Sequence, residues 1–147
     1  MRYLAKIPKT CERKGVDRLV LESFMYRITE VAAAVHAQEM TFSVAQTGGS
    51  LVARNVTYEG VVLDLDTVGA FSREPEDHIS QDYLEMSLSV AVLRRAVSNN
   101  HQNDLPARIR SAYLEKLEAF GAEAAWKSRI EQIIGSDEQI AGITRAF

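Results

Sequence analysis

The stretch that decides the fold is DHISQDYLEMSLSVAVLRRAV, residues 77 to 97. Apolar side chains recur there in steps of three and four, which is the spacing of one face of an α-helix. A second apolar set, Leu84, Leu88 and Ala91, lies on the opposite side of the same helix. We therefore expect a central helix clamped between two apolar layers, with another subunit as a candidate source of one layer. The first set consists of Ile79, Tyr83, Met86, Val90, Leu93 and Val97.

Length and composition are those of an ordinary globular protein. The chain has 147 residues, of which 46% are hydrophobic and 25% charged, so one domain with one core is expected. The single cysteine, Cys11, cannot form a disulfide within the chain. Residues 1 to 10 lack the apolar core of a secretory signal, and no apolar run is long enough to span a bilayer. We expect a cytoplasmic protein without a membrane partner, located in the host cytoplasm or the virion if a virus encodes it.

Charge is distributed unevenly along the chain. Residues 1 to 20 contain six basic and two acidic side chains, whereas residues 59 to 85 contain eight acidic side chains and one arginine. This polarity favours contact between the basic end of one copy and the acidic region of the next, although two solvated surfaces would have the same composition. The residues expected at an oligomer interface are Leu84, Leu88, Ala91, Arg2, Lys6, Arg13 and Lys14.

Residues 1 to 103 are predicted to form an α+β core in the order β-α-βββ-α. Residues 1 to 7 could form a first strand that Pro8 ends, and residues 17 to 37 have the apolar periodicity of a helix. Alternating apolar residues from 40 to 45, 51 to 58 and 61 to 66, separated by turns, indicate a three-stranded antiparallel meander. The two long helices, 17 to 37 and 77 to 97, would cover its apolar face.

Residues 104 to 147 are predicted to form a helical C-terminal subdomain after a polar break at 98 to 104. A helix from Asp104 would end at Gly121, a second would run from 122 to 134, and Ser136 with Gln139 forms a capping box for a third. This subdomain belongs either to the same domain or, by a swap at the polar break, to a neighbouring copy.

The strongest enzymatic candidate is acidic. Asp64 and Asp66 lie two apart on a predicted strand, so their carboxylates share a face, and Asp77 and His78 follow. Such ligands suit Mg²⁺ or Mn²⁺ and would fit a metal-dependent phosphoesterase or nuclease. Alternating aspartates are equally typical of the wet face of a half-buried sheet, so we do not assign a metal site.

Other chemical motifs are weak or missing from the sequence. His36, His78 and His101 lack the spacing of a zinc site, and we interpret His36 as a helix-end residue that interacts with the helix dipole. Gly48, Gly49 and Ser50 lack the elbow of a serine nucleophile and the lysine of a phosphate loop. We therefore predict neither catalytic residues nor a cofactor.

Two kinds of ligand other than protein stay open. Arg94, Arg95, Arg108 and Arg110, with the basic N-terminal stretch, could contact nucleic acid, but the net charge of −3 and the missing recognition motif make this partner less favoured. Small anionic ligands such as nucleotides could bind at a subunit junction that the N-terminal stretch lines.

The leading hypothesis for function is a non-enzymatic interaction module that self-associates. It would act as an assembly or structural subunit, or as an inhibitor that sequesters a protein partner. The reasons are the two-sided apolar helix and the segregated charge, both of which favour neighbours. Small acidic oligomers of this kind occur among proteins that viruses and mobile elements encode.

Overall fold

The computed structural model describes residues 18–44, 51, 55–57, 59–62, 65, 68–97 and 104–147. Of this part of the chain 72% is helical, in five helices with one two-stranded antiparallel sheet. The prediction of a three-stranded meander packed by two long helices is therefore wrong, and the fold is mostly helical. The elements are α2 (Arg18–Ala37), β1 (Met40–Thr41), β2 (Gly69–Ala70), α3 (Pro75–Val97), α4 (Leu105–Ala119), α5 (Ala124–Ile134) and α6 (Asp137–Ala146).

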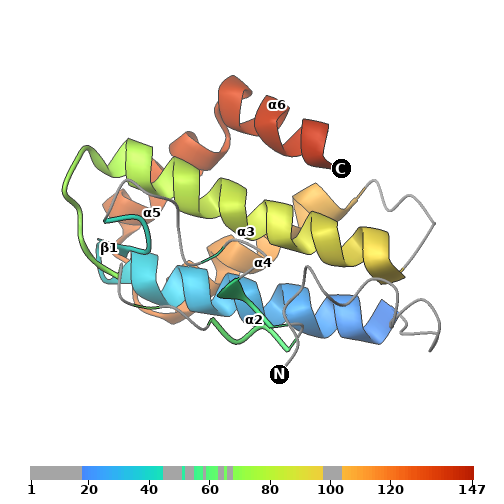
Figure 1. Cartoon of the computed structure of the whole chain (residues 1–147). Coiled ribbons are helices and arrows are strands. Elements are labelled where there is room, and N and C mark those ends of the chain that lie inside the picture. Colours follow the sequence, from blue (N-terminus) through green and yellow to red (C-terminus); the bar gives the residue numbers. More distant parts are fainter. Residues whose placement is uncertain are drawn as a thin grey trace.

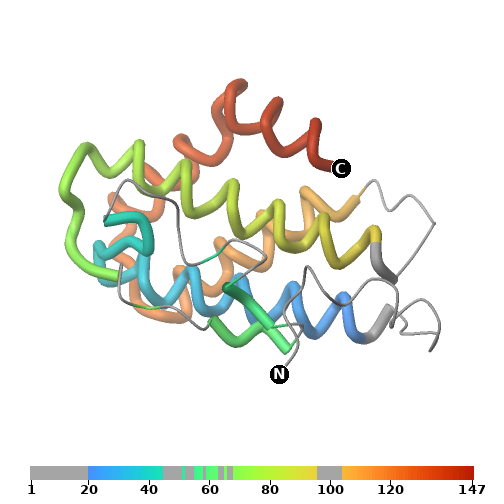
Figure 2. The backbone as a smooth tube through the Cα atoms, viewed as in Figure 1, coloured from blue at the N-terminus to red at the C-terminus, as the bar shows by residue number. Residues whose placement is uncertain are grey.

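Helix α3 is the central element, as its two apolar sides predict. It packs against α2 on one side and against α5 and α6 on others, while α4 packs against α2 (Figure 1). The tube view shows α6 along the side of α3 that faces away from α2 (Figure 2). Helices of this chain thus pack on both sides of α3, and α6 supplies part of the layer over the second apolar side.

The helices begin and end where local chemistry predicts. Pro75 is the first residue of α3, a position where proline is favoured because the N–H that it lacks would have no partner within the helix. The carboxylates of Glu76 and Asp77 complement the positive end of the helix dipole. Gly121 ends α4 with a φ of 82°, a conformation that glycine adopts easily. The main-chain N–H of Gln139 donates to Ser136 Oγ over 3.3 Å, which caps α6.

One hydrophobic core joins the helices. The first apolar set of α3 is buried from Ile79 to Leu93, with Ile79, Met86, Val90 and Leu93 at 0% exposure and Tyr83 at 2%. It belongs to the same core cluster as residues of α2, α4 and α5, because each of these helices has an apolar stripe at the spacing of one helical face. The members from α2, α4 and α5 include Leu21, Phe24, Ile28, Leu105, Ile109, Tyr113, Leu117, Trp126 and Ile130.

The predicted first strand of the meander ends after two residues. Met40 and Thr41 pair with Ala70 and Gly69, a partner outside the predicted meander. The main-chain N–H of Phe42 donates to an aspartate on α3, and that of Ser43 donates to the Thr41 hydroxyl. Because side-chain oxygens take the donors that a longer ladder would need, the strand stops there.

Within the described residues, the tight turn at Glu59 and Gly60 is what remains of the other two predicted strands. It lies inside a single antiparallel bridge between Val56 and Val62. Positions 52–54, 58, 63, 64 and 66 of these strands, the predicted strand 1–7 and most of the polar break at 98–104 lie outside the described residues.

No described helix has the length and hydrophobicity that a bilayer crossing requires.

The turn at Gly60, between the bridged residues Val56 and Val62, packs against α2. We predict that Gly60→Ala destabilises the protein. Its φ of 81° costs a side-chain-bearing residue about 1–2 kcal/mol, and an added Cβ would lie 2.5 Å from Arg27 Cβ. Gly121→Ala is the matched control, because Gly121 has a φ of 82° and open space around it. Urea unfolding should show that Gly60→Ala loses at least about 1 kcal/mol more than Gly121→Ala. Equal losses would contradict the contact with α2.

Candidate functional site

Six polar side chains form a buried network where α2, β1, α3 and α4 meet. All six are fully buried at 0% exposure. Burying so many polar groups is unfavourable unless they bond to one another, and hydrogen bonds link them into one chain. The buried polar network consists of His36, Thr41, Ser43, His78, Asp82 and Tyr113.

Asp82 is the hub of this network. Its Oδ2 atom accepts from His36 Nε2 at 2.9 Å, from the Thr41 hydroxyl at 2.5 Å and from the main-chain N–H of Phe42 at 3.0 Å. Hydrogen bonds to an ionised acceptor are stronger than neutral ones. A single carboxylate oxygen therefore holds the end of α2 and the end of β1 against α3.

His36 extends the network to the C-terminal helices. Its Nδ1 atom lies 2.6 Å from the Tyr113 hydroxyl of α4, and its main-chain carbonyl accepts from Trp126 Nε1 of α5 over 2.7 Å. The interpretation of His36 as a helix-end residue that interacts with the helix dipole was incomplete, because the ring also bonds to two other helices. The sequence distance from His36 to Tyr113 and Trp126 hides these contacts.

His78 is held as a neutral ring. Its Nε2 atom accepts from the main-chain N–H groups of Ser72 and Arg73, each at 3.1 Å, so the proton of the neutral ring is on Nδ1, which donates to Ser43 Oγ over 3.1 Å. A proton on Nε2 would face two other donors. Burial, and then the charge of Arg73, lower the pKa of His78.

Ser43 and His78 do not form a catalytic pair. Ser43 Oγ accepts a hydrogen bond from His78 Nδ1. The hydroxyl of a nucleophilic serine instead donates its proton to the histidine. The other nitrogen of His78 meets main-chain N–H groups, where a catalytic triad has a carboxylate. Both side chains are fully buried, so the contact holds the segment just after β1 against the first turn of α3.

The residues of the predicted metal site are not assembled among those described. His78 is buried with both nitrogens in hydrogen bonds, while Asp77, its neighbour in the chain, is exposed. Within the described part of the chain, no three side chains of the metal-binding types His, Cys, Asp and Glu are grouped to hold an ion. Asp64 and Asp66 lie outside it.

The predicted interface residues have different environments. Ala91 is buried at 1% exposure and Leu84 is partly buried, but Leu88 is 40% exposed. Helix α6 packs close to Leu84, since a Cβ placed on Gly142 would lie 3.6 Å from Leu84 Cδ1. The chain's own α6 therefore shares the second apolar side of α3 and leaves Leu88 accessible. The basic candidates Arg2, Lys6, Arg13 and Lys14 lie outside the described residues.

The arginines proposed as a nucleic-acid patch largely contact the protein itself. Arg94 donates to the carbonyl of Phe147 over 3.2 Å, and Arg95 donates to the carbonyl of Ala146. Arg108 forms an ion pair with Glu22 of α2. Arg110 is exposed, beside a mostly apolar hollow of about 200 Å³ between α3, α4 and α6.

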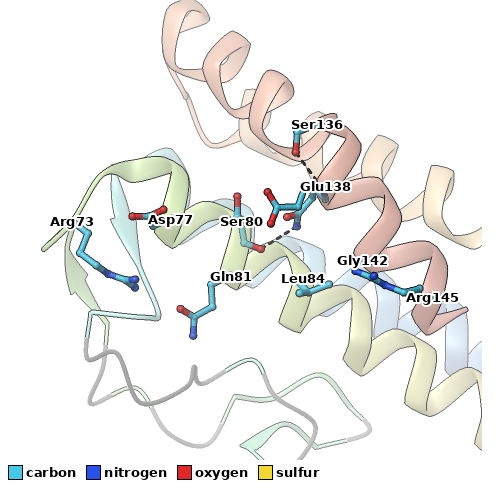
Figure 3. A pocket seen from close by; sticks show the side chains of 10 residues that line it. Arg73, Asp77, Ser80, Gln81, Leu84, Ser136, Glu138, Gly142 and Arg145 are labelled. Atoms are coloured by element: carbon cyan, nitrogen blue, oxygen red, sulfur yellow. Dashed lines mark hydrogen bonds between the residues drawn. The ribbon is translucent and has the colours of Figure 1, made fainter.

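An open cleft of about 430 Å³ lies between α3 and α6 (Figure 3). Arg73 and Asp77 lie at one end, Arg145 lies at the other, and Glu138 lies between them. Gln139 Nε2 donates to the carbonyl of Ser80 over 3.0 Å, which holds α6 beside α3. The lining residues are Arg73, Asp77, Ser80, Gln81, Leu84, Ser136, Glu138, Gln139, Gly142 and Arg145.

The accessible surface on this side of the molecule we call the α3–α6 face. Leu88 belongs to it because it lies one helical turn beyond Leu84, which lines the cleft. The side chains of Asp77, Glu138 and Arg145 are exposed, whereas Nε and Nη2 of Arg73 are buried without a hydrogen-bond partner among the described residues. The α3–α6 face consists of Asp77, Gln81, Leu84, Leu88, Glu138, Gly142 and Arg145.

Sequence reasoning identified parts of this face but not the network. Leu84 and Leu88 stood out because they are apolar residues outside the main stripe of α3. The network left one indirect signal: a helix that is apolar on two sides has too little surface to expose all its polar residues. That signal could have pointed to His78 and Asp82, each of which is next to a core residue in the chain, but it was not used in the prediction from sequence.

Comparisons of the chain with protein-family models, with curated proteins and with solved structures gave no match. The function therefore has to be inferred from the network and the α3–α6 face.

The neutral state of His78 predicts a loss of stability in acid. The unfolded ring titrates near its ordinary pKa of about 6.5, above the pKa in the fold, so the unfolded chain takes up its proton first as the pH falls. The contribution of His78 is complete above pH 6.5 and is lost as the pH falls from there towards the lower pKa of the folded state. NMR titration of the ring should give that lower pKa and a proton on Nδ1 at neutral pH.

Urea unfolding gives the matching thermodynamic test. Stability should fall as the pH drops below about 6.5, and His78→Asn, which lacks the titrating ring, should show a shallower fall. A pKa of His78 above 6.5, or a proton on Nε2, would contradict the assignment.

We also predict that Asp82→Ala is among the most damaging substitutions in α3. It leaves three buried donors without an acceptor, which should cost about 3 kcal/mol or more of unfolding free energy. Asp77→Ala, an exposed aspartate on the same helix, should cost about 1 kcal/mol or less. Similar losses for the two variants in urea unfolding would show that the network is not the anchor described.

Proposed function

We propose that this protein is a non-enzymatic interaction module that self-associates through the α3–α6 face. It would act as an assembly subunit, or as an inhibitor that sequesters a protein partner. The observation that carries the proposal is Leu88, a large apolar side chain 40% exposed on the central helix beside an open cleft.

The composition of the face supports contact with protein. Its middle is apolar, with Leu84 and Leu88, and its ends carry the exposed charges of Asp77 and Arg145. An apolar centre with a polar rim is the usual anatomy of a protein interface. Gly142 packs against Leu84, so Leu88 is the more accessible of the two apolar side chains.

The use of the reactive side chains also favours binding over catalysis. His36, His78 and Asp82, which could otherwise act as acids or bases, are buried and bonded to other parts of the fold. Their hydrogen bonds stabilise the arrangement of helices that presents the α3–α6 face. The metal-dependent phosphoesterase hypothesis receives less support, because its histidine is committed to Ser43 and the main chain.

We predict that Leu88→Glu abolishes or strongly weakens self-association. A charge in the apolar centre of an interface must be desolvated, which costs more there than on an open surface. Phe120→Glu is the matched control, because Phe120 is also 40% exposed but lies at the end of α4, outside the α3–α6 face.

Light scattering over a range of protein concentrations measures the effect. The wild type and Phe120→Glu should show a concentration-dependent increase in mass, and Leu88→Glu should remain at 16.4 kDa with unchanged urea unfolding. A wild type that is monomeric at every concentration would overturn the proposed function. Equal association of all three proteins would place the contact elsewhere.

A further inference from the structure

We propose that the occupant of the α3–α6 face is the same face of a second copy, turned end for end about a two-fold axis. This inference rests on the proposed function and specifies its geometry. The head-to-tail contact expected from the sequence would give an open series, whereas this contact gives a closed pair. In such a pair the α3–α6 faces of both copies are buried against each other, and neither can bind a third copy.

The first step is the direction of the two helices. Near the start of α6, Gln139 donates to the carbonyl of Ser80, and at its last residue Arg95 of α3 donates to the carbonyl of Ala146. Helix α6 therefore runs alongside α3 in the same direction, with both N-terminal ends at one end of the face and both C-terminal ends at the other.

The second step is the charge that these ends carry. The exposed carboxylates of Asp77 and Glu138 lie in the first turns of α3 and α6, and the exposed guanidinium groups of Arg95 and Arg145 lie in their last turns. Arg73 also lines this part of the cleft, with two of its guanidinium nitrogens buried, so its positive charge offsets one of the two carboxylates. The part of the face from Asp77 to Glu138 therefore remains net acidic, and the end at Arg145 is basic.

The third step is that Glu138 and Arg145 of one copy can pair with Arg145 and Glu138 of a reversed copy, because the distance between the two residues is the same in both copies. They are seven residues apart, so two helical turns, or about 10 Å, separate them along α6. Neither side chain forms an ion pair with another described residue. When a second face is turned end for end, Glu138 of each copy meets Arg145 of the other, and the helix dipoles oppose one another.

The apolar centre fits the same operation. Leu84 and Leu88 lie between the charged ends, so rotation about an axis through the middle of the face brings the two apolar centres together. Turning one copy end for end satisfies both the charges and the apolar residues, whereas parallel stacking would place like charges together.

Charge reversal tests this geometry. Glu138→Arg sets arginine against arginine at both ends of the pair, and Arg145→Glu sets carboxylate against carboxylate. Because the two-fold axis repeats each contact, either variant should raise the dimer dissociation constant by about tenfold or more. The double variant should recover most of the affinity. An equimolar mixture of the two single variants should form a heterodimer, since each unlike contact then becomes favourable.

The control reverses the ion pair between Glu118 of α4 and Lys127 of α5, by Glu118→Lys and Lys127→Glu. Each single variant and the double variant should have the dimer dissociation constant of the wild type. Sedimentation of the full chain gives the mass, and twice 16.4 kDa is expected for the wild type and for the mixture.

The outcomes separate this inference from the proposed function. The two-fold geometry alone is overturned if the wild type self-associates but the equimolar mixture of Glu138→Arg and Arg145→Glu does not form a heterodimer. It is also overturned if the wild type forms species larger than a dimer. A wild type that binds only a different protein through Leu88 also overturns it. A wild type that is always monomeric overturns both.

Discussion

The arrangement of the helices depends on one carboxylate oxygen. Asp82 Oδ2 accepts three hydrogen bonds, from a side chain of α2, a side chain of β1 and the main chain just after it. Hydrophobic packing alone tolerates sliding of one helix past another, whereas directional bonds in a buried site fix the register. The position of α3, and with it the α3–α6 face, follows from this anchor.

The helices could be predicted from the sequence, but the sheet could not. Residues 17 to 37 and 77 to 97 have a strong helical period, and the structure has helices there within two residues of those limits. The alternation after Met40 predicted a longer strand, yet Thr41 and Ser43 direct their hydroxyls to α3 and to each other, where Asp82 and His78 are buried. Periodicity detects which side is apolar, but not which side-chain oxygen takes a backbone donor.

The two apolar sides of α3 were recognised correctly, but their cover was not. Part of the second side is occupied by α6 of the same chain, a helix that the sequence predicted without indicating where it docks. Gln139, the second residue of the capping box, shows why. Its main-chain N–H donates to Ser136, as the motif predicts, while its side chain donates to the carbonyl of Ser80 on α3. Local motifs specify where a helix starts, and tertiary contacts specify where it lies.

The buried polar network also affects how this fold can diverge during evolution. Its members come from four elements that lie far apart in the sequence, and replacing any one leaves a buried donor or acceptor without a partner. Exposed positions outside the α3–α6 face carry no such constraint, and substitutions there usually change stability by less than about 0.5 kcal/mol. Remote kinship would then survive as a sparse signature: a histidine ending one helix, two hydroxyl residues shortly after it, and a histidine and an aspartate one turn apart on the next.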